Sequence, residues 1–243
     1  MILPFASYNL IMIAAAVIPA LFLMIKVYKS DKLEPESPKL LFGLVLAGVA
    51  SAFLALIEET VLEYALNIVL AKGTLLYDII LYFVVVALSE ESSKYLLMKR
   101  KTWRNPEFDC RFDGIVYAAF TSLGFALWEN ISYVFSFGMS TALIRAFTAV
   151  PGHACFGIFM GVFYSIAKEY DLNGDHVKSS LYRKLAVIIP VLIHGAYDFI
   201  VSMNSDYATI FFFVFVILLF SVTFRLINKM SRNDRHMTWH ILN

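Results

Sequence analysis

The chain has 243 residues, of which 60% are hydrophobic and 16% are charged, and its mean hydropathy is +0.71. A soluble domain carries roughly a quarter charged residues, so this composition excludes an ordinary soluble protein and indicates a chain solvated mostly by lipid. The net charge of +1 gives no basis for a nucleic-acid partner, and the two cysteines, Cys110 and Cys155, are too few for a disulfide framework and are expected to be free thiols.

Apolar stretches of about 20 residues predict seven membrane-spanning helices, because a helix satisfies its own backbone hydrogen bonds in hydrocarbon. In chain order the predicted spans are 5–27, 40–62, 75–98, 113–136, 145–168, 184–203 and 206–228. No basic region precedes the first span and no cleavage site comes after it, so we expect it to be retained. The sequence therefore predicts an all-α, polytopic membrane bundle forming one transmembrane domain over residues 1–243, with a motif-bearing core at about 75–203.

The distribution of lysine and arginine predicts the orientation of these spans. Eighteen of the 20 flank the loops after the first, third and fifth spans or lie in the C-terminal tail, and only Lys72 and Arg145 lie on the opposite side. Basic flanks face the cytoplasm, so the N-terminus is predicted to be outside and the C-terminus to be cytoplasmic. The same alternation supports the span count, because one missed helix would scramble it.

Four consecutive spans carry polar side chains that lipid should exclude, since a charge at mid-membrane costs about 2.5 to 3.5 kcal/mol. From the third span to the sixth these side chains are Glu90, Glu91 and Lys94; Glu129 and Asn130; His153; and His194 and Asp198. The first and last spans are nearly free of such groups. A helix turns a polar stripe towards the bundle interior, so we expect the four spans to converge on one polar pocket.

The spacing within these spans supports a shared pocket. His194 and Asp198 are four residues apart and project from one helical face, and Glu90 and Lys94 share that spacing and could pair. Small residues on the same helices would permit close backbone approach. These residues are Gly124, Gly152, Gly157, Gly161 and Gly195.

Two chemistries fit two imidazoles and several carboxylates in a dehydrated pocket. Histidine and carboxylate are normal zinc ligands, and a further carboxylate could act as a general base. A metal-free reaction, in which a glutamate activates water and histidines stabilise an oxyanion, fits equally well. Taken singly, each feature also has a structural interpretation, such as a buried Glu90–Lys94 ion pair or a structural His153.

Two further groups of ionisable residues carry little weight in this interpretation. Glu58, Glu59 and Glu63 are expected near the outer end of the second span, where interfacial water suffices to solvate them. His236 and His240 have the spacing of one helical face, but they lie in a polar tail with few partners.

At these residues the sequence resembles the PrsW family of intramembrane proteases, part of a wider superfamily of CAAX prenyl proteases and bacteriocin-processing membrane proteins. Three motifs of that family have counterparts in this sequence. The paired glutamates with a lysine are Glu90, Glu91 and Lys94, and the phenylalanine with a glutamate four residues later is Phe125 with Glu129. The final histidine–aspartate pair is His194 and Asp198. His153 and the segment DKLEPESP also match, although a second EP pair is replaced by ES. The resemblance covers about residues 28–200, and the motifs in this order are highly specific.

The resemblance implies site-1 cleavage of a membrane-anchored anti-sigma factor, or of a similar single-span substrate, in a bacterial plasma membrane. Glu90 and Glu91 are then the candidates for water activation, with a slight preference for Glu91, while Lys94 tunes them and Asn130 orients a substrate or ligand. The expected ligands of a zinc ion, or the groups that stabilise an oxyanion without one, are Glu129, His153, His194 and Asp198. The family is classed with metalloproteases, whereas the related CAAX proteases look like metal-free glutamate enzymes.

Two other classes of function remain open on the sequence. An ion-coupled transporter also needs buried carboxylates and histidines, and a catalytically silent binding or immunity protein could share the superfamily fold. Depth is the weakest point of the predicted site. At 1.5 Å per residue, His194 and its expected partners fall roughly 15–24 Å deep but Glu91 only about 10 Å. For Glu91 to reach the others, the helix must continue into KRKTW or the bundle must tilt.

Overall fold

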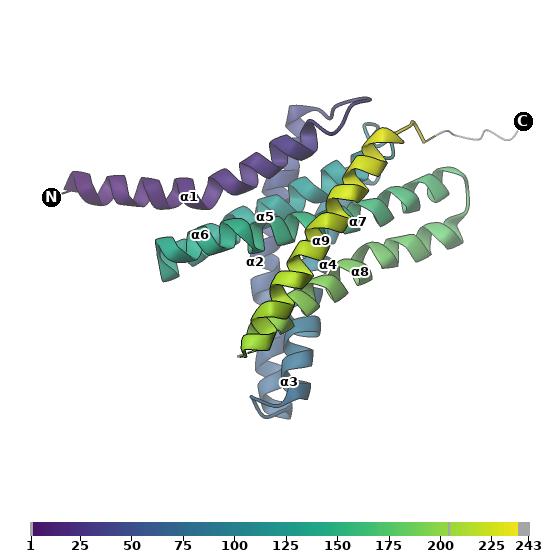
Figure 1. Cartoon of the computed structure of the whole chain (residues 1–243). Coiled ribbons are helices and arrows are strands. Elements are labelled where there is room, and N and C mark those ends of the chain that lie inside the picture. The colour runs from purple at the N-terminus through teal and green to yellow at the C-terminus, as the bar shows by residue number, and fades with distance from the viewer. Residues whose placement is uncertain (1, 204, 238–243) are drawn as a thin grey trace, which may run out of the picture.

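The computed structural model describes residues 2–203 and 205–237, and the regular structure in these two ranges is helical (Figure 1). The long helices are α1 (Ile2–Tyr28), α2 (Pro38–Val69), α5 (Asp113–Phe137), α7 (Ala149–Leu172), α8 (His176–Ser202) and α9 (Asp206–Arg232). A continuous run comprises α3 (Leu75–Ile80), the π-helix η1 (Leu81–Ala87) and α4 (Leu88–Thr102), and α6 (Met139–Phe147) links α5 to α7. The predicted all-α fold is confirmed.

Five helices in the described ranges are long and apolar enough to cross a membrane. They are Asn9–Tyr28, Pro38–Val69, Met139–Leu172 (α6 and α7 taken together), His176–Ser202 and Asp206–Arg232. The predicted spans 75–98 and 113–136 are not among them. Residues 75–98 are divided between α3, η1 and α4, and both stretches carry charged side chains such as Glu90, Glu91 and Glu129. The chain is thus a multi-pass membrane protein, whereas the count of seven spans and the orientation of the termini stay predictions.

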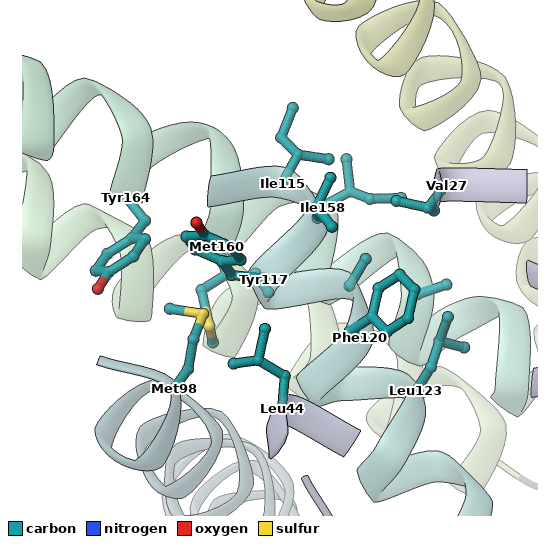
Figure 2. Close-up of a cluster of buried hydrophobic side chains, with 14 of the residues drawn as sticks. Val27, Leu44, Met98, Ile115, Tyr117, Phe120, Leu123, Ile158, Met160 and Tyr164 are labelled. Atoms are coloured by element: carbon teal, nitrogen blue, oxygen red, sulfur yellow. The ribbon is translucent and has the colours of Figure 1, made fainter. Parts of the chain in front are cut away.

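Helix α5 lies at the centre of the bundle, in contact with α1, α2, α4, α6 and α7. Its residues from Ile115 to Ala126 are buried on every face, as expected for a helix that is apolar around its whole circumference. The core beside them includes Leu44 from α2, Met98 from α4 and Ile158 from α7 (Figure 2). This enclosure fixes α5 from several sides and so fixes the residues at its far end.

Small residues let the neighbouring helices approach α5 closely. Helix α2 runs across the direction of α5 (Figure 1), and at the crossing a Cβ on Gly48 or Gly124 would overlap backbone atoms of the other helix. Helix α7 meets α5 through Gly157 and Gly161 in the same way. The predicted close approach is therefore confirmed for these positions, but it is wrong for Gly152, where the nearest atoms lie 3.6 Å from a Cβ.

Several helix boundaries differ from the predicted spans. Helix α2 continues to Val69, seven residues past the predicted end of the second span, and α4 continues to Thr102. The predicted fifth span is divided, because α6 ends at Phe147 and α7 begins at Ala149. Gly138, with a φ of +86°, provides the left-handed turn that separates α5 from α6. These changes decide which polar side chains reach the centre of the bundle.

Candidate active site

The side chains that the sequence singled out meet between four helices, as predicted. We call them the intramembrane network. Its members are Glu90, Glu91 and Lys94 on α4, Glu129 on α5, His153 on α7, and His194 and Asp198 on α8. The depth problem is resolved because α4 continues into the KRKT segment, which places Glu91 Oε1 3.0 Å from His194 Nδ1.

The π-helix η1 sets the approach of α4 to α8. The seven residues of η1 end directly before α4, three residues ahead of Glu90. Phe83 of η1 packs so tightly on Gly195 that a Cβ there would lie 2.5 Å from the ring and 3.0 Å from the Phe83 Cα. Since Gly195 is the next residue after His194, this contact holds the histidine beside the start of α4. π-Helical turns often occur at functional sites.

The ammonium group of Lys94 lies at the centre of the network. It donates to Glu90 Oε2 at 2.9 Å, to Glu91 Oε1 at 2.7 Å and to His153 Nδ1 at 3.2 Å. An ammonium has three donors, so all three are used. Lys94 is fully buried and also lies 3.9 Å from the centre of the Phe125 ring. The predicted Glu90–Lys94 pair is confirmed, and Lys94 bridges both glutamates.

The hydrogen bond from Lys94 determines which nitrogen of the His153 ring carries the hydrogen. Because Nδ1 accepts from the ammonium, Nε2 carries the proton and donates to Glu129 Oε2 at 2.8 Å. Arg145 of α6 lies 2.8 Å from the same carboxylate oxygen and also donates to Asn130. Glu129 therefore holds His153 in position and is itself held by an arginine.

His194 lies between two carboxylates and against an aromatic ring. Its Nδ1 is 3.0 Å from Glu91 Oε1, and its Nε2 is 3.2 Å from Asp198 Oδ2, which confirms that His194 and Asp198 share one helical face. The ring of Phe156 stacks on it, with centroids 4.6 Å apart and planes at 19°. Both ring nitrogens face acceptors, so a ring with two N–H donors satisfies both contacts.

A cavity of about 520 Å³ opens beside the network. Its polar lining includes Glu90, Glu129, His153, His194 and Asp198. Glu91 and Lys94 do not line it, and Glu91 is fully buried with Oε2 lacking a hydrogen-bond partner among the described residues. The rest of the lining is largely aromatic and aliphatic, from α2, η1, α5, α7 and α8. The cavity thus brings a row of ionisable groups to one wall of an apolar chamber.

Comparison with known proteins supports the interpretation of this site. The sequence profile described as "PrsW family intramembrane metalloprotease" matches residues 36–224. The chain belongs to this family. It is 32% identical over 226 residues to a protein named Protease PrsW from Clostridioides difficile (strain 630), covering 90% of this chain and 91% of that protein.

Two further relatives have the same name. The protein from Oceanobacillus iheyensis is 32% identical over 223 residues, covering 91% of this chain and 96% of its own length. The protein from Bacillus subtilis (strain 168) is 31% identical over 195 residues, covering 80% and 84%. No solved structure matches this chain. The suspected PrsW resemblance is confirmed, and with it the class of membrane peptidase.

The structure adds residues that sequence reasoning missed. Glu59 lines the cavity and Glu58 accepts a hydrogen bond from Ser93 at 3.1 Å, so both contribute to the region of the site, which their position in the sequence does not indicate. The reason is that α2 extends to Val69, which moves both glutamates away from the helix end. The sequence indicates Arg145 only as a basic residue on the side predicted to be outside. Its pairing with Glu129 depends on the separate helix α6.

The structure also places the other polar residues that the sequence singled out. Asn130 does not line the cavity, since its amide donates to the Ala16 carbonyl on α1 and accepts from Arg145, so it joins helices together. His236 is not without partners, because its Nδ1 lies 3.2 Å from the sulfur of Cys110. His240 lies outside the described residues. Cys110 and Cys155 are free thiols, as predicted.

The donor set of a PrsW metalloprotease can be compared with these side chains. Glu90, His153 and His194 offer ligand atoms within 4.8 Å of one another, and one carboxylate with two imidazoles is a known zinc-peptidase set. Glu129 and Asp198, expected as ligands, lie against histidine nitrogens instead, where they orient the rings. The residues therefore fit a zinc-like ion with a smaller ligand set than predicted.

Lys94 and such an ion would compete for the same groups. A neutral imidazole has one lone pair, and in His153 this lone pair accepts from Lys94. A metal at His153 needs that lone pair and also the charge of Glu90, which Lys94 contacts. Metal binding to the network would thus require Lys94 to give up two of its three hydrogen bonds.

Proposed function

We propose that this PrsW-family protein hydrolyses a peptide bond of a membrane-anchored protein in the cavity beside the intramembrane network, and that Glu90 activates the water. One observation carries the proposal. Glu90 lines the cavity, contacts Lys94 at 2.9 Å, and lies within 4.8 Å of ligand atoms of both His153 and His194.

The geometry favours Glu90 over Glu91 for this role. A general base must be within hydrogen-bond reach of the water it deprotonates, and Glu90 faces the space where water and substrate can enter. Glu91 is fully buried, and its Oε1 is engaged by Lys94 and His194. We therefore reverse the slight preference for Glu91 and propose that this residue positions His194.

The reaction can be described through these residues. Glu90 accepts a proton from water while the water oxygen bonds to the peptide carbonyl carbon, and the proton then passes to the amide nitrogen as the C–N bond breaks. The rings of His153 and His194 line the same cavity, and each N–H already donates to a carboxylate. A ring that exchanged its carboxylate for the negative oxygen formed on the way would stabilise that oxygen. Lys94 pairs with both glutamates at a depth where an unpaired carboxylate is costly.

We propose Glu90, His153 and His194 as the side chains that hold a zinc-like ion in the metalloprotease form. Such an ion supplies a Lewis acid that polarises a carbonyl and acidifies a bound water. The metal form and the metal-free form use the same three residues, but Glu90 would be a ligand in the first and is the general base in the second. They differ in the cation that balances their charge, which is the metal in one and Lys94 in the other.

The lining of the cavity supports a peptide substrate that is itself apolar. Its aliphatic and aromatic walls include Leu56, Tyr82, Val86, Trp128 and Tyr197. These walls suit a segment unwound from a single transmembrane helix, whose backbone needs polar partners in the membrane. A single-span bacterial protein such as an anti-sigma factor, in the plasma membrane, is the substrate class we propose.

The experiment that tests this function is cleavage by the purified protein in proteoliposomes. A tagged single-span anti-sigma factor from the same organism is reconstituted with wild type or Glu90→Gln, and products are separated by mass. We expect one defined cut with wild type and its loss in the variant. The ion-coupled transporter alternative predicts cation uptake by the same vesicles and an intact substrate, while the silent binding protein predicts neither cleavage nor uptake.

A further inference from the structure

Three buried carboxylates gather at another end of the bundle, outside the intramembrane network. Asp31 and Glu36 lie in the loop between α1 and α2, and Asp113 is the first residue of α5. Their exposed fractions are 5%, 4% and 1%. One oxygen from each lies within 4.8 Å of the others. We call this group the loop carboxylate cluster.

Most oxygens of the cluster have no hydrogen-bond donor. Both oxygens of Asp31, Oε1 of Glu36 and Oδ1 of Asp113 are buried and unpartnered among the described residues. Oδ2 of Asp113 accepts from the backbone N–H groups of Asp109 and Cys110. The backbone N–H groups of Leu33 and Glu34 lower the pKa of Asp31, and the Tyr117 hydroxyl lowers that of Glu36, but burial outweighs both effects. A buried carboxylate without a donor or a cation is costly, so four such atoms pointing into one small volume require an explanation.

The nearby arginines do not supply the missing charge. Arg111 precedes α5 by two residues, yet its guanidinium pairs with Glu169 of α7, and Arg235 pairs with the same glutamate. In the described ranges the ion pairs of the chain include none to Asp31, Glu36 or Asp113. Asp234 adds a further carboxylate near Asp31 rather than a cation.

We propose that Asp31, Glu36 and Asp113 bind a hard divalent cation of the Mg²⁺ and Ca²⁺ class. The ligand atoms are all carboxylate oxygens, which these ions prefer, whereas zinc and copper sites usually include nitrogen or sulfur. Three converging carboxylates balance two positive charges with one to spare, and water can complete the coordination shell. The site is separate from the peptidase chemistry and does not depend on it.

The cation would fasten the α1–α2 loop to the start of α5. Asp31 and Glu36 flank the bend of that loop, and Asp113 begins the helix that carries Glu129 near its other end. Without a cation the three groups repel one another. Burial, and after it repulsion from Asp234, raises the pKa of Asp31 to about 6. Burial raises the pKa of Glu36 to about 8, and Glu107 and Asp31 add to it. Proton uptake is thus the alternative way to neutralise the cluster.

Cation-dependent thermal unfolding of the full-length protein in detergent tests the proposal. The protein is stripped with chelator and then titrated with Mg²⁺ or Ca²⁺ at a pH of about 8, where protons compete less for the carboxylates than at neutral pH. At a free cation concentration of about 100 times the Kd, we expect the Tm of the protein to rise by roughly 5–10 °C. Asp31→Asn and Glu36→Gln should lose this rise, while the control Asp171→Asn, near the end of α7, should keep it.

A second variant distinguishes cation binding at the loop carboxylate cluster from metal binding in the active site. The same titration is repeated with His194→Ala, which removes a ligand of the proposed catalytic metal but leaves the loop carboxylate cluster intact. We expect the full rise in Tm in this variant even where it is inactive. An unchanged Tm in wild type, or an equal rise in wild type, Asp31→Asn and Glu36→Gln, would overturn the proposal. Neither result would bear on peptidase activity, so the two proposals fail separately.

Discussion

The intramembrane network and the loop carboxylate cluster both bury several carboxylates, but they neutralise them differently. In the network every carboxylate has a basic partner, since Lys94 bridges two glutamates, Arg145 holds Glu129 and His194 lies against Asp198. In the loop carboxylate cluster the described residues provide no basic side chain and few N–H donors. A buried carboxylate can thus be neutralised by a basic side chain of the protein, as in the network, or by a cation or proton from outside, as proposed for the loop carboxylate cluster. Only the first kind of pairing can be recognised in the sequence of a single helix, as with Glu90 and Lys94.

The largest expected effect concerns the base of the network. Glu90→Gln should lower the rate of cleavage by roughly 10²-fold to 10⁴-fold, because the amide cannot accept the proton of the attacking water. Substrate binding should persist, since Gln keeps the size of the side chain. Single-turnover cleavage in detergent measures this, with Glu63→Gln as an exposed control on α2.

Glu91→Gln tests the assignment between the two glutamates. Glu91 acts through His194, so its loss should reduce the rate less than Glu90→Gln does and should change the pH profile of cleavage. If Glu91→Gln is the more severe change, the roles of the two residues are reversed while the site itself stands.

The next effect breaks the pairing that distinguishes the network. Lys94→Met removes the ammonium and leaves Glu90 and Glu91 buried without their shared partner, which should destabilise the fold by about 3–5 kcal/mol. Lys72→Met is the matched control, since Lys72 pairs with Glu63 at an exposed position and should cost at most about 1 kcal/mol. Thermal unfolding in the same detergent compares them, and equal losses would contradict the central role of Lys94.

A smaller effect tests the backbone contact that aligns the network. Gly195→Ala places a methyl group 2.5 Å from the Phe83 ring and should cost about 1–3 kcal/mol, together with a loss of cleavage as His194 moves away from α4. Gly152→Ala is the matched control, because its nearest neighbours lie 3.6 Å away. Similar unfolding temperatures for both variants would show that η1 is not held by this contact.

The smallest effect concerns pH and the loop carboxylate cluster. In chelated protein Asp31 and Glu36 have raised pKa values of about 6 and about 8, so the folded state binds more protons than the unfolded chain in this range. Stability should therefore fall as pH rises from about 5 to 8. The charged neighbours of these two groups, namely Glu34, Glu107, Asp113 and Asp234, are acidic and act in the same direction.

Neutralising one member should remove part of that pH dependence. Glu36→Gln in chelated protein is expected to raise stability at pH 8 by about 1 kcal/mol, or roughly 2–4 °C in Tm, because it relieves repulsion. The sign is opposite to that of Lys94→Met, which makes the pair a direct comparison of the two regions. A drop in Tm for Glu36→Gln under chelation would show that its carboxylate has a favourable partner in the protein.

Much of the network could be predicted from the sequence because its pairings are local. Lys94 with Glu90, and His194 with Asp198, are paired by helical spacing, and the cost of charge in lipid forces the polar faces together. The partners that were missed come from elsewhere in the chain. Arg145 reaches Glu129 only because α6 forms a separate helix, and Glu59 reaches the cavity only because α2 is longer than its apolar core.

The segment DKLEPESP, which holds Asp31 and Glu36, resembles the family, but for a similar reason the sequence does not show that these residues form a cluster with Asp113. Asp31 and Glu36 lie in a polar loop, where carboxylates are normally solvated, and Asp113 lies about 80 residues later as an ordinary first-turn acid. Their burial depends on how the loop folds over the end of α5, which no local pattern records. The ligand set of the network shows the same limit, since the sequence named four candidates but their distances single out Glu90 in place of Glu129 and Asp198.

The π-helix η1 lets the run from α3 to α4 hold one extra residue while α4 keeps its face towards the cavity. Its wider turns absorb an additional residue relative to a regular α-helix, and it ends three positions before Glu90. Deleting one residue within Leu81–Ala87 would therefore restore regular winding and leave α4 facing the cavity in nearly the same way. The same deletion in a regular helix turns every residue beyond it by about 100°. A deletion in the first half of α5 would thus turn Glu129 away from His153, whereas one in η1 would not turn Glu90 away from the cavity.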